Sequence, residues 1–174
     1  MKIYTRKGDG GRTCLPDGSG IAKDAAVMEV CGTLDELSAA LGLVRAERLP
    51  GATDALIEEI QRTLLRLGGE IVMSDLAADA SQAIGPQHIT ALEAAIDGHA
   101  SDLPPLRAFV LPGNTRAEAA LHLARTVCRR AERRMVSLVQ AEPQRVAEHH
   151  LSYLNRLSDL LFVLARCMFE PMSY

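Results

Sequence analysis

The chain has 174 residues, 48% of them apolar and 3% aromatic, which is enough for one domain with a sizeable core. Its formal net charge of −3 argues against a general nucleic-acid binder, because that function needs a basic surface. The four cysteines have no CxxC or metal-ligand spacing, so we expect free thiols, which fit a reducing compartment. The N-terminus has no apolar signal region, and no apolar run is long enough to span a bilayer. We therefore expect a cytoplasmic protein with no membrane partner.

The N-terminal stretch, residues 1–23, shows no helical period. It combines five glycines with lysine, arginine and hydroxyl side chains. Glycine lets backbone N–H groups turn toward an anion, and the basic side chains add positive charge. No GK[ST] follows at the spacing of a Walker A loop. The stretch is therefore either a flexible tail or a phosphate-binding arm.

Five later segments have apolar residues at the alternating three- and four-residue steps of bundle helices. These segments cover about Ala25–Ala46, about Ala52–Ala77, a shorter stretch from Pro86, Thr115–Val139 and about Pro143–Met168. A proline-containing loop, Gly98–Asn114, precedes the fourth. No repeat or linker divides the chain, so we expect a single all-α domain over 1–174. Residues 24–174 would form a five-helix bundle with ferritin-like up-down packing, and residues 1–23 a non-helical arm.

The fourth segment carries two adjoining stripes of opposite character. The apolar stripe consists of Ala117, Leu121, Ala124, Cys128, Ala131, Met135 and Leu138. The polar stripe consists of His122, Arg125, Arg129, Glu132 and Val136, with further charge from Arg130, Arg133 and Arg134. Thr115 and Glu118 have the spacing of a capping box at the helix start. The arginines form either a solvated face or a partly buried anion site, since forked guanidinium groups suit phosphate oxygens.

Other segments offer weaker signals. Asp35 lies beside a core stripe and is either a plain exposed acid or a charge with a partner. Asn155 and Asp159 lie one turn apart and could share a polar site. The apolar segment FVLPG, which begins at Phe109, either plugs the core or lines a pocket for a large flat ligand. Cys128 and Cys167 fall on apolar stripes, which predicts buried thiols.

The sequence also argues against several kinds of chemistry. Ferritin-like metal sites need paired Glu-x-x-His motifs, and hydrolases of one large class need GxSxG; neither motif is present. What remains is binding of a nucleotide or polyphosphate by the glycine-rich arm and the arginine stripe. Any Mg²⁺ would be held mainly by the phosphates.

Several blocks of sequence are together more specific than any single motif. They are YTRKGDGGRT, GTLDELSAALG, FVLPGN, RTVCRRAERR and YLNRLSDLLFVLAR, and they cover roughly residues 3–45 and 107–166. In this combination the chain resembles the PduO-type ATP:cob(I)alamin adenosyltransferase family. The resemblance implies a homotrimeric five-helix bundle with active sites between adjacent subunits. The implied reaction transfers the 5′-deoxyadenosyl group of ATP to the cobalt of reduced cobalamin, a corrinoid, and releases tripolyphosphate.

The resemblance also implies roles for particular residues. The implied ATP-binding residues are Thr5, Arg6, Lys7, Gly8, Thr13, Lys23, Arg129, Arg130, Glu132, Arg133 and Asn155. The implied catalytic residues are Asp35, Phe109, Arg125 and Arg129. Arg125 would pair with Asp35, and Phe109 would displace the lower axial ligand of the corrin, which makes the cobalt easier to reduce. Mg²⁺ would come with ATP and be held mainly by its phosphates, and a flavoprotein reductase and a cobalamin-dependent client enzyme are further expected partners.

The chain departs from the family pattern mainly in its arm. Lys7 stands where many relatives have threonine, and Arg12-Thr13-Cys14 replaces a more hydroxyl-rich stretch. The segment Leu15–Ala22 lacks the usual phenylalanine and glutamate, and Asn114 stands where a second glycine is common. These departures keep a second hypothesis open, in which a trimeric ATP- or corrinoid-binding sensor module has lost catalysis.

Overall fold

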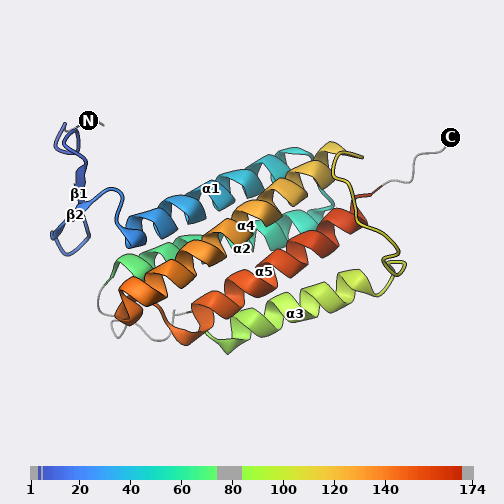
Figure 1. Ribbon diagram of the computed structural model, residues 1–174. Helices are drawn as coiled ribbons and strands as arrows, with labels where there is room; N and C mark the ends of the chain where they lie inside the picture. Colours follow the sequence, from blue (N-terminus) through green and yellow to red (C-terminus); the bar gives the residue numbers. More distant parts are fainter. Residues whose placement is uncertain (1–3, 5, 74–83, 170–174) are drawn as a thin grey trace.

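Five α-helices make up most of the computed structural model, which describes residues 4, 6–73 and 84–169 (Figure 1). The helices are α1 (Ala26–Ala46), α2 (Gly51–Val72), α3 (Pro86–Ala100), α4 (Arg116–Ala141) and α5 (Glu148–Cys167). The predicted five-helix bundle is therefore confirmed. The arm is non-helical, as predicted, but it also contains a short antiparallel hairpin that the sequence did not reveal. Its strands are β1 (Arg12–Cys14) and β2 (Gly20–Ala22), with Thr13 opposite Ile21.

Helices that follow one another along the chain run in opposite directions (Figure 1). Helix α1 contacts α2 and α4, α4 contacts α5, and α5 contacts α3. Figure 1 shows α1, α4 and α5 side by side, with α4 running in the opposite direction to the other two. The predicted seam of α1 is buried: Val27, Val30, Leu34, Leu37, Leu41 and Val44. So is most of the apolar stripe of α4, from Leu121 to Leu138. None of the helices described is both long and apolar enough to cross a bilayer.

Three helix boundaries differ from the sequence prediction. Helix α5 begins at Glu148 because Pro143–Arg145 forms a separate 3₁₀ turn (η1), after which Val146 and Ala147 are extended. Helix α3 continues to Ala100, inside the predicted loop. Helix α2 ends at Val72, and the rest of its predicted range, from residue 74 on, lies outside the described residues. Proline and local capping decide such ends, and apolar spacing does not report them.

The cysteines are all free thiols, but only one of the two predicted to be buried is so. Cys128 is buried and donates to the carbonyl oxygen of Leu154 at 3.3 Å. Burial raises the pKa of its thiol. Cys167 is exposed, which contradicts the prediction. It is the last residue of α5, and the helix end is open to solvent there although the thiol donates to the carbonyl oxygen of His99 in α3 at 3.6 Å.

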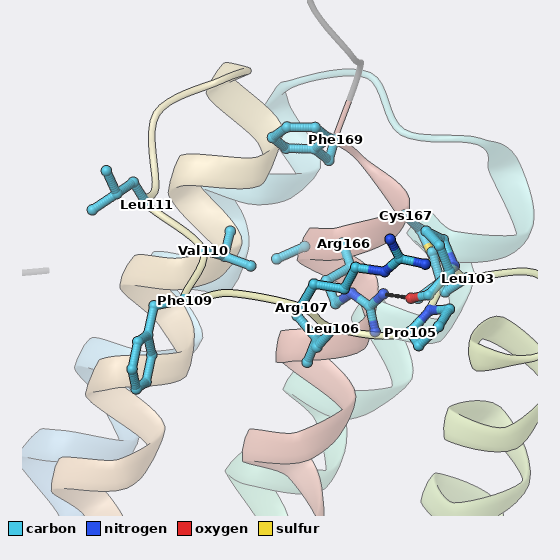
Figure 2. A pocket seen from close by; sticks show the side chains of 12 residues that line it. Leu103, Pro105, Leu106, Arg107, Phe109, Val110, Leu111, Arg166, Cys167 and Phe169 are labelled. Atoms are coloured by element: carbon cyan, nitrogen blue, oxygen red, sulfur yellow. Dashed lines mark hydrogen bonds between the residues drawn. The ribbon is translucent and has the colours of Figure 1, made fainter.

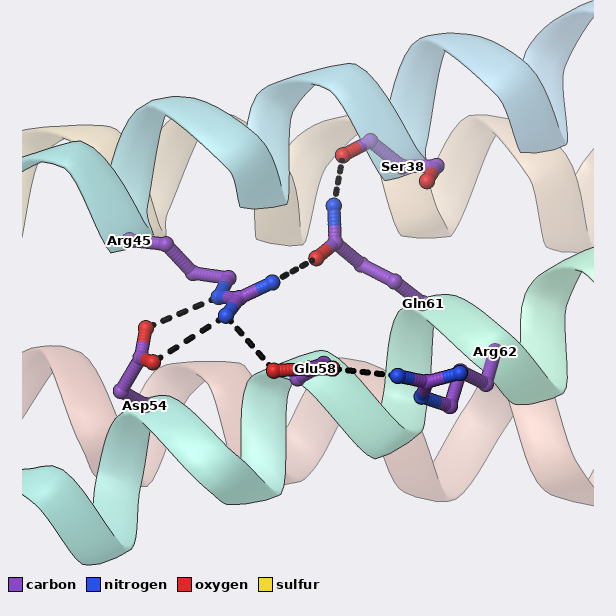
Figure 3. Close-up of polar contacts among 6 residues, drawn as sticks. All are labelled: Ser38, Arg45, Asp54, Glu58, Gln61 and Arg62. Carbon is purple, nitrogen blue, oxygen red and sulfur yellow. Dashed lines mark hydrogen bonds and ion pairs between the residues drawn. The ribbon is translucent and has the colours of Figure 1, made fainter.

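A polar cluster around Arg45 fastens the end of α1 to the start of α2 (Figure 3). The guanidinium donates to both carboxylate oxygens of Asp54, at 2.8 and 3.1 Å, and to Glu58 at 2.8 Å. It also donates to the side-chain oxygen of Gln61 at 3.1 Å, whose amide nitrogen donates to the carbonyl of Ser38 at 2.8 Å. The hydrogen bond from Arg45 holds the pKa of the Asp54 carboxyl below its ordinary value. One side chain thus ties two helices at four points.

We expect Arg45→Ala to lower the melting temperature by a few degrees, because it removes a forked, charge-assisted contact shared by several groups. Thermal unfolding followed by circular dichroism measures this. Arg62→Ala is the matched control, since the Arg62 side chain is 66% exposed and forms an exposed i,i+4 pair with Glu58, and its removal should change little. Concentrated salt should narrow the difference between Arg45→Ala and the parent. Equal melting temperatures would show that the cluster adds no stability.

A second polar connection is buried at the opposite end of α2. The side chain of His150 is fully buried, and its Nε2 lies 2.7 Å from Oε2 of Glu70. Its Nδ1 accepts from the backbone N–H of Ala147 at 3.2 Å, so the ring proton is on Nε2 and is donated to Glu70. The other oxygen of Glu70 accepts from the N–H of Ile84 at 2.9 Å. Desolvation lowers the pKa of His150 below its ordinary value of 6.5, although Glu70 acts in the opposite direction.

This burial predicts a loss of stability in mild acid. The folded pKa of His150 lies below the unfolded value of 6.5, so the unfolded chain binds more protons between the two values. The free energy of unfolding should therefore decrease as the pH falls from about 6.5 toward about 5. Urea titrations across that range measure the slope. His150→Gln should reduce it, whereas His99→Gln, outside this connection, should leave it as it is. A free energy of unfolding that does not change with pH would contradict the prediction.

Candidate functional site

The hairpin arm brings two of the predicted ATP-binding residues against each other. A Cβ atom at Gly8 would lie 3.0 Å from the Nζ of Lys23, so the absence of a side chain at Gly8 makes room for the ammonium group. The backbone N–H of Lys23 donates to the carbonyl of Gly11 at 2.9 Å, which closes the arm on itself. Gly11 has φ +76°, a conformation that glycine adopts without strain. The arm is a folded basic turn rather than a tail.

The remaining predicted residues of the arm lie around this turn. Arg6 has φ +62°, and its guanidinium carbon lies 5.7 Å from the ring centroid of Tyr4. Lys7 is exposed, and Thr13 is half-buried in β1 opposite Ile21. Thr5 lies outside the described residues. The structure therefore places Thr13 in the hairpin, Arg6, Lys7 and Gly8 in the turn before it, and Lys23 directly after it.

The predicted residues of α4 and α5 share one polar face. The side chain of Asn155 donates to Oε1 of Glu132 at 3.0 Å, which joins α5 to α4. Arg130 forms an ion pair with Glu36 of α1. Arg129 is exposed, and its carbonyl accepts from the guanidinium of Arg133 at 3.1 Å. The polar stripe thus exposes Arg129 and Arg133 to solvent, while Arg130 is paired with the carboxylate of Glu36.

A polar groove of about 280 Å³ lies beside this face, between α1 and α4. Arg130 and Arg134 line one side, and Glu29, Gly32 and Glu36 line the other. The Nε of Arg134 lies 3.4 Å from Oε2 of Glu29. The groove therefore contains paired charges of both signs, and its arginines are held by acids of α1.

The implied pair of Asp35 and Arg125 is not formed within the chain. Asp35 is exposed on α1, and none of the ion pairs among the described residues joins it to Arg125. Arg125 is half-buried, and its Nε donates to Nδ1 of His122 at 3.4 Å. The pairing of Asp35 with Arg125 stays a prediction.

Sequence reasoning missed a buried pair in the first turns of α4. Glu118 is fully buried and His122 is 3% exposed. The predicted cap is half confirmed: the hydroxyl of Thr115 accepts from the N–H of Glu118 at 3.1 Å. The carboxyl of Glu118, however, accepts from the N–H groups of Gly113 and Asn114. Neither position carries an apolar residue, and the neighbouring residues are mostly alanine. The spacing of apolar residues therefore did not indicate that Glu118 and His122 are buried.

The loop between α3 and α4 lines an apolar cavity of about 760 Å³ with the end of α5 (Figure 2). Leu106, Val110 and Leu111 come from the loop, and Ala165 and Phe169 come from α5 and the residues after it. The FVLPG segment thus lines a cavity and does not plug the core, which general considerations favoured from the sequence; that the cavity takes a large flat ligand stays a prediction. Leu111 is 86% exposed, so the cavity is open to a large ligand.

Phe109 stands at the edge of this cavity with its ring completely exposed. Figure 2 shows it projecting from the loop on the side away from Leu103 and Cys167. The cavity wall also holds the guanidinium groups of Arg107 and Arg166, and Arg166 donates to the carbonyl of Pro104. An exposed ring beside an apolar cavity with two cations suits a flat ligand that carries polar substituents.

Within the described ranges, no three His, Cys, Asp or Glu side chains are grouped as a metal site. The acids of the polar face are instead engaged with arginine or asparagine: Glu36 with Arg130, and Glu132 with Asn155. The protein side of the site thus supplies positive charge and apolar surface.

A model of the cobalamin adenosyltransferase family matches residues 3–168. The chain belongs to the cobalamin adenosyltransferase family. The match covers every block that carried the resemblance in the sequence, together with the segment between them, so the resemblance is confirmed.

Individual relatives agree with this assignment. The chain is 43% identical over 169 residues to the corrinoid adenosyltransferase PduO of Citrobacter freundii; the match covers 95% of this chain and 49% of that protein. The chain thus spans about half the length of that relative. It is 40% identical over 170 residues to the corrinoid adenosyltransferase of Bacillus subtilis, covering 95% of this chain and 86% of the relative.

A solved structure shares the fold. It is a phenylalanine-to-histidine variant of the PduO-type ATP:corrinoid adenosyltransferase of Lactobacillus reuteri, complexed with cobalamin and ATP. The TM-score is 0.85 at 32% identity, and the alignment covers 95% of this chain and 89% of the other. The similarity of the whole bundle at this identity means that the positions of the helices are comparable in the two proteins.

Proposed function

We propose that the protein transfers the 5′-deoxyadenosyl group of ATP to the cobalt of reduced cobalamin and releases tripolyphosphate. The observation that carries the proposal is the combination of an exposed guanidinium face on α4 with an open apolar cavity beside Phe109. The first suits a triphosphate and the second a corrin ring. The relative of the same fold from Lactobacillus reuteri was solved with cobalamin and ATP bound.

The residues present suit this reaction because it needs no side-chain nucleophile or base. Reduced cobalt donates its electron pair to C5′ of ATP, a cobalt–carbon bond forms, and the C5′–O5′ bond breaks. The electron pair of the broken bond leaves on tripolyphosphate. The protein therefore has to hold the two substrates in line and stabilise negative charge on the leaving group. Arg129, Arg130 and Arg133 are placed for the second task.

Mg²⁺ enters this proposal with ATP. The described residues form no group of three metal ligands, so the ion would be held mainly by the phosphate oxygens. Bound there, it would neutralise part of the charge of the triphosphate. The arm, with Lys23 beside Gly8, and the arginines of α4 would contact the remaining oxygens.

The arrangement of the chain supports an active site shared between subunits of a homotrimer. The arm lies beyond one end of the bundle and the Phe109 loop lies at the other (Figure 1). Helix α1 alone has 21 residues and is about 30 Å long, so one chain does not bring the two together. On α4, Leu123 and Val136 are exposed on either side of Arg129 and would be covered by a neighbouring copy. Asp35 would then pair with Arg125 across the same contact.

We propose for Phe109 the catalytic role that the family resemblance implies, and the exposure of its ring supports this role. A free aromatic ring at the edge of the cavity can occupy the lower face of a bound corrin and displace the axial ligand, which leaves a four-coordinate cobalt that is easier to reduce. A flavoprotein reductase that supplies the reduced cobalt, and a cobalamin-dependent enzyme that uses the product, complete the proposal, with the cytoplasm as its compartment.

The experiment that tests the function mixes the protein with Mg-ATP and chemically reduced cobalamin. The absorbance spectrum of adenosylcobalamin and free tripolyphosphate should both appear. Absence of a cobalt–carbon product would end the proposal. Calorimetry on the same sample distinguishes the remaining hypothesis, because a non-catalytic sensor would bind ATP or corrinoid without turnover.

A further inference from the structure

Glu118 and His122 form a buried polar pair that the proposed reaction does not use directly. Oε1 of Glu118 lies 3.2 Å from Nε2 of His122, one helical turn away. Both atoms are buried, the contact is out of hydrogen-bond alignment, and neither atom has another hydrogen-bond partner among the described residues. Burial of polar groups without hydrogen bonds lowers the stability of the fold, so the presence of this pair suggests a functional role.

One side of the pair leads to the loop that carries Phe109. The second carboxyl oxygen of Glu118, Oε2, accepts from the N–H of Gly113 at 2.8 Å and from that of Asn114 at 3.0 Å. Gly113 has φ +125°, which other residues rarely adopt, and this turn aims both N–H groups at the carboxyl. Glu118 therefore fastens the end of the loop four residues after Phe109.

The other side of the pair leads to the arginine stripe. Nε of Arg125 donates to Nδ1 of His122 at 3.4 Å. An imidazole that accepts at Nδ1 carries its proton on Nε2, the atom that faces Glu118. The ring of Phe162 from α5 lies near His122, with centroids 6.1 Å apart and planes inclined by 58°.

We propose that His122 is a positioning residue for Arg125 and that Glu118 selects the tautomer of His122 that makes this possible. Glu118, His122 and Arg125 then form one connection from the Phe109 loop to the arginine stripe. The proposal rests on the proposed function only in that Arg125 belongs to the adenosyl-transfer site. With the proton on Nδ1 instead, the N–H groups of Arg125 and His122 would face each other, and the unprotonated Nε2 would face the carboxylate of Glu118.

Burial of His122 favours the neutral form of its imidazole ring. It lowers the pKa of His122 below its ordinary value of 6.5, and the nearby guanidinium of Arg125 acts in the same direction, while Glu118 opposes them. A neutral imidazole is the form that can accept from Arg125.

Two isosteric variants separate the two halves of the connection. Asparagine at position 122 can place its amide oxygen where Nδ1 lies, so His122→Asn retains the acceptor for Arg125 and loses the N–H that faces Glu118. Glutamine can place its amide nitrogen where Nε2 lies, so His122→Gln retains the N–H that faces Glu118 and loses the acceptor for Arg125. We expect His122→Gln to lower kcat by about 10- to 100-fold, as for a misplaced catalytic group, and His122→Asn to retain most of it. His149→Gln, on the half-buried side of α5, should retain full activity.

A double-mutant cycle with Arg125→Ala excludes a merely structural role. If His122 acts through Arg125, His122→Gln should cause no further loss of kcat in the Arg125→Ala background. An equal loss in both backgrounds, in variants whose circular dichroism matches the parent, would overturn the proposal. So would a His122→Asn variant as impaired as His122→Gln.

A measurement that needs no catalysis keeps this inference separate from the proposed function. In protein with ¹⁵N-labelled histidine, NMR should show His122 protonated at Nε2 and unprotonated at Nδ1, and Arg125→Ala should shift the Nδ1 resonance. A proton on Nδ1 would overturn the proposal even in an active enzyme. A protein with the expected tautomer that makes no adenosylcobalamin would refute the proposed function and leave the contact standing.

Discussion

Arg129→Ala is expected to lower kcat for adenosyl transfer by about 10²- to 10³-fold, the usual loss when a group that stabilises developing negative charge is removed. The side chain is exposed, and its neighbours along the helix, Arg130 and Arg133, are engaged elsewhere within the chain. Arg129 is therefore the arginine of the stripe whose guanidinium is most available to a ligand. Its loss should leave the bundle and its melting temperature unchanged, because its guanidinium forms no hydrogen bond or ion pair within the part of the chain that the structure describes.

The measurement is the rate of appearance of adenosylcobalamin at saturating ATP, with kcat and KM determined separately. Arg62→Ala, another exposed arginine but on α2, is the control and should keep the parent rate. Arg129→Lys should recover only part of the loss, since an ammonium group lacks the planar fork. If Arg129→Ala turns over at the parent rate, the stripe is a solvated face and the triphosphate is held elsewhere.

Phe109→Ala is expected to leave ATP affinity unchanged while it removes most of the activity that depends on four-coordinate cobalt. The ring is completely exposed and packs against no core residue, so its removal should not change folding. Its effect should therefore appear only when corrinoid is bound. Low-temperature electron paramagnetic resonance of the cob(II)alamin complex with ATP reports directly on the axial ligand of the cobalt.

The spectrum of the parent should contain a four-coordinate species that is absent from the variant. Leu65→Ala removes another largely exposed apolar side chain, 77% exposed on α2, and should behave as the parent. Phe109→Trp should retain part of the signal, because an aromatic ring remains beside the corrin. A four-coordinate signal of equal strength in Phe109→Ala would assign ligand displacement to another group.

Apolar spacing predicted the bundle well because a helix that buries one face must repeat its apolar residues at that period. The seam from Val27 to Val44 and the stripe from Leu121 to Leu138 are buried as expected. Helix ends were less predictable. The 3₁₀ turn at Pro143 depends on proline and local capping, and the exposure of Cys167 depends on its place at the end of α5; the spacing of apolar residues reports neither.

The candidate site likewise combines residues that the sequence reveals with residues that only the fold reveals. The arginine stripe and the arm are visible in the sequence because charge and glycine are concentrated there. The burial of Glu118 and His122 was not, since it depends on the backbone of Gly113 and on Phe162, which lies forty residues further along the chain. Contacts between distant segments create such environments, and a single sequence does not report them.

The placement of the arm and the Phe109 loop at opposite ends of one chain has a genetic consequence. If each site takes its arm from one copy and its aromatic ring from the next, a defect in either element spoils only the sites to which that copy contributes it. An arm-defective chain and a loop-defective chain, each inactive alone, would then complement each other in mixed trimers, with about one site in four intact after random assembly. Co-expression of the two variants should therefore give activity that neither variant shows alone.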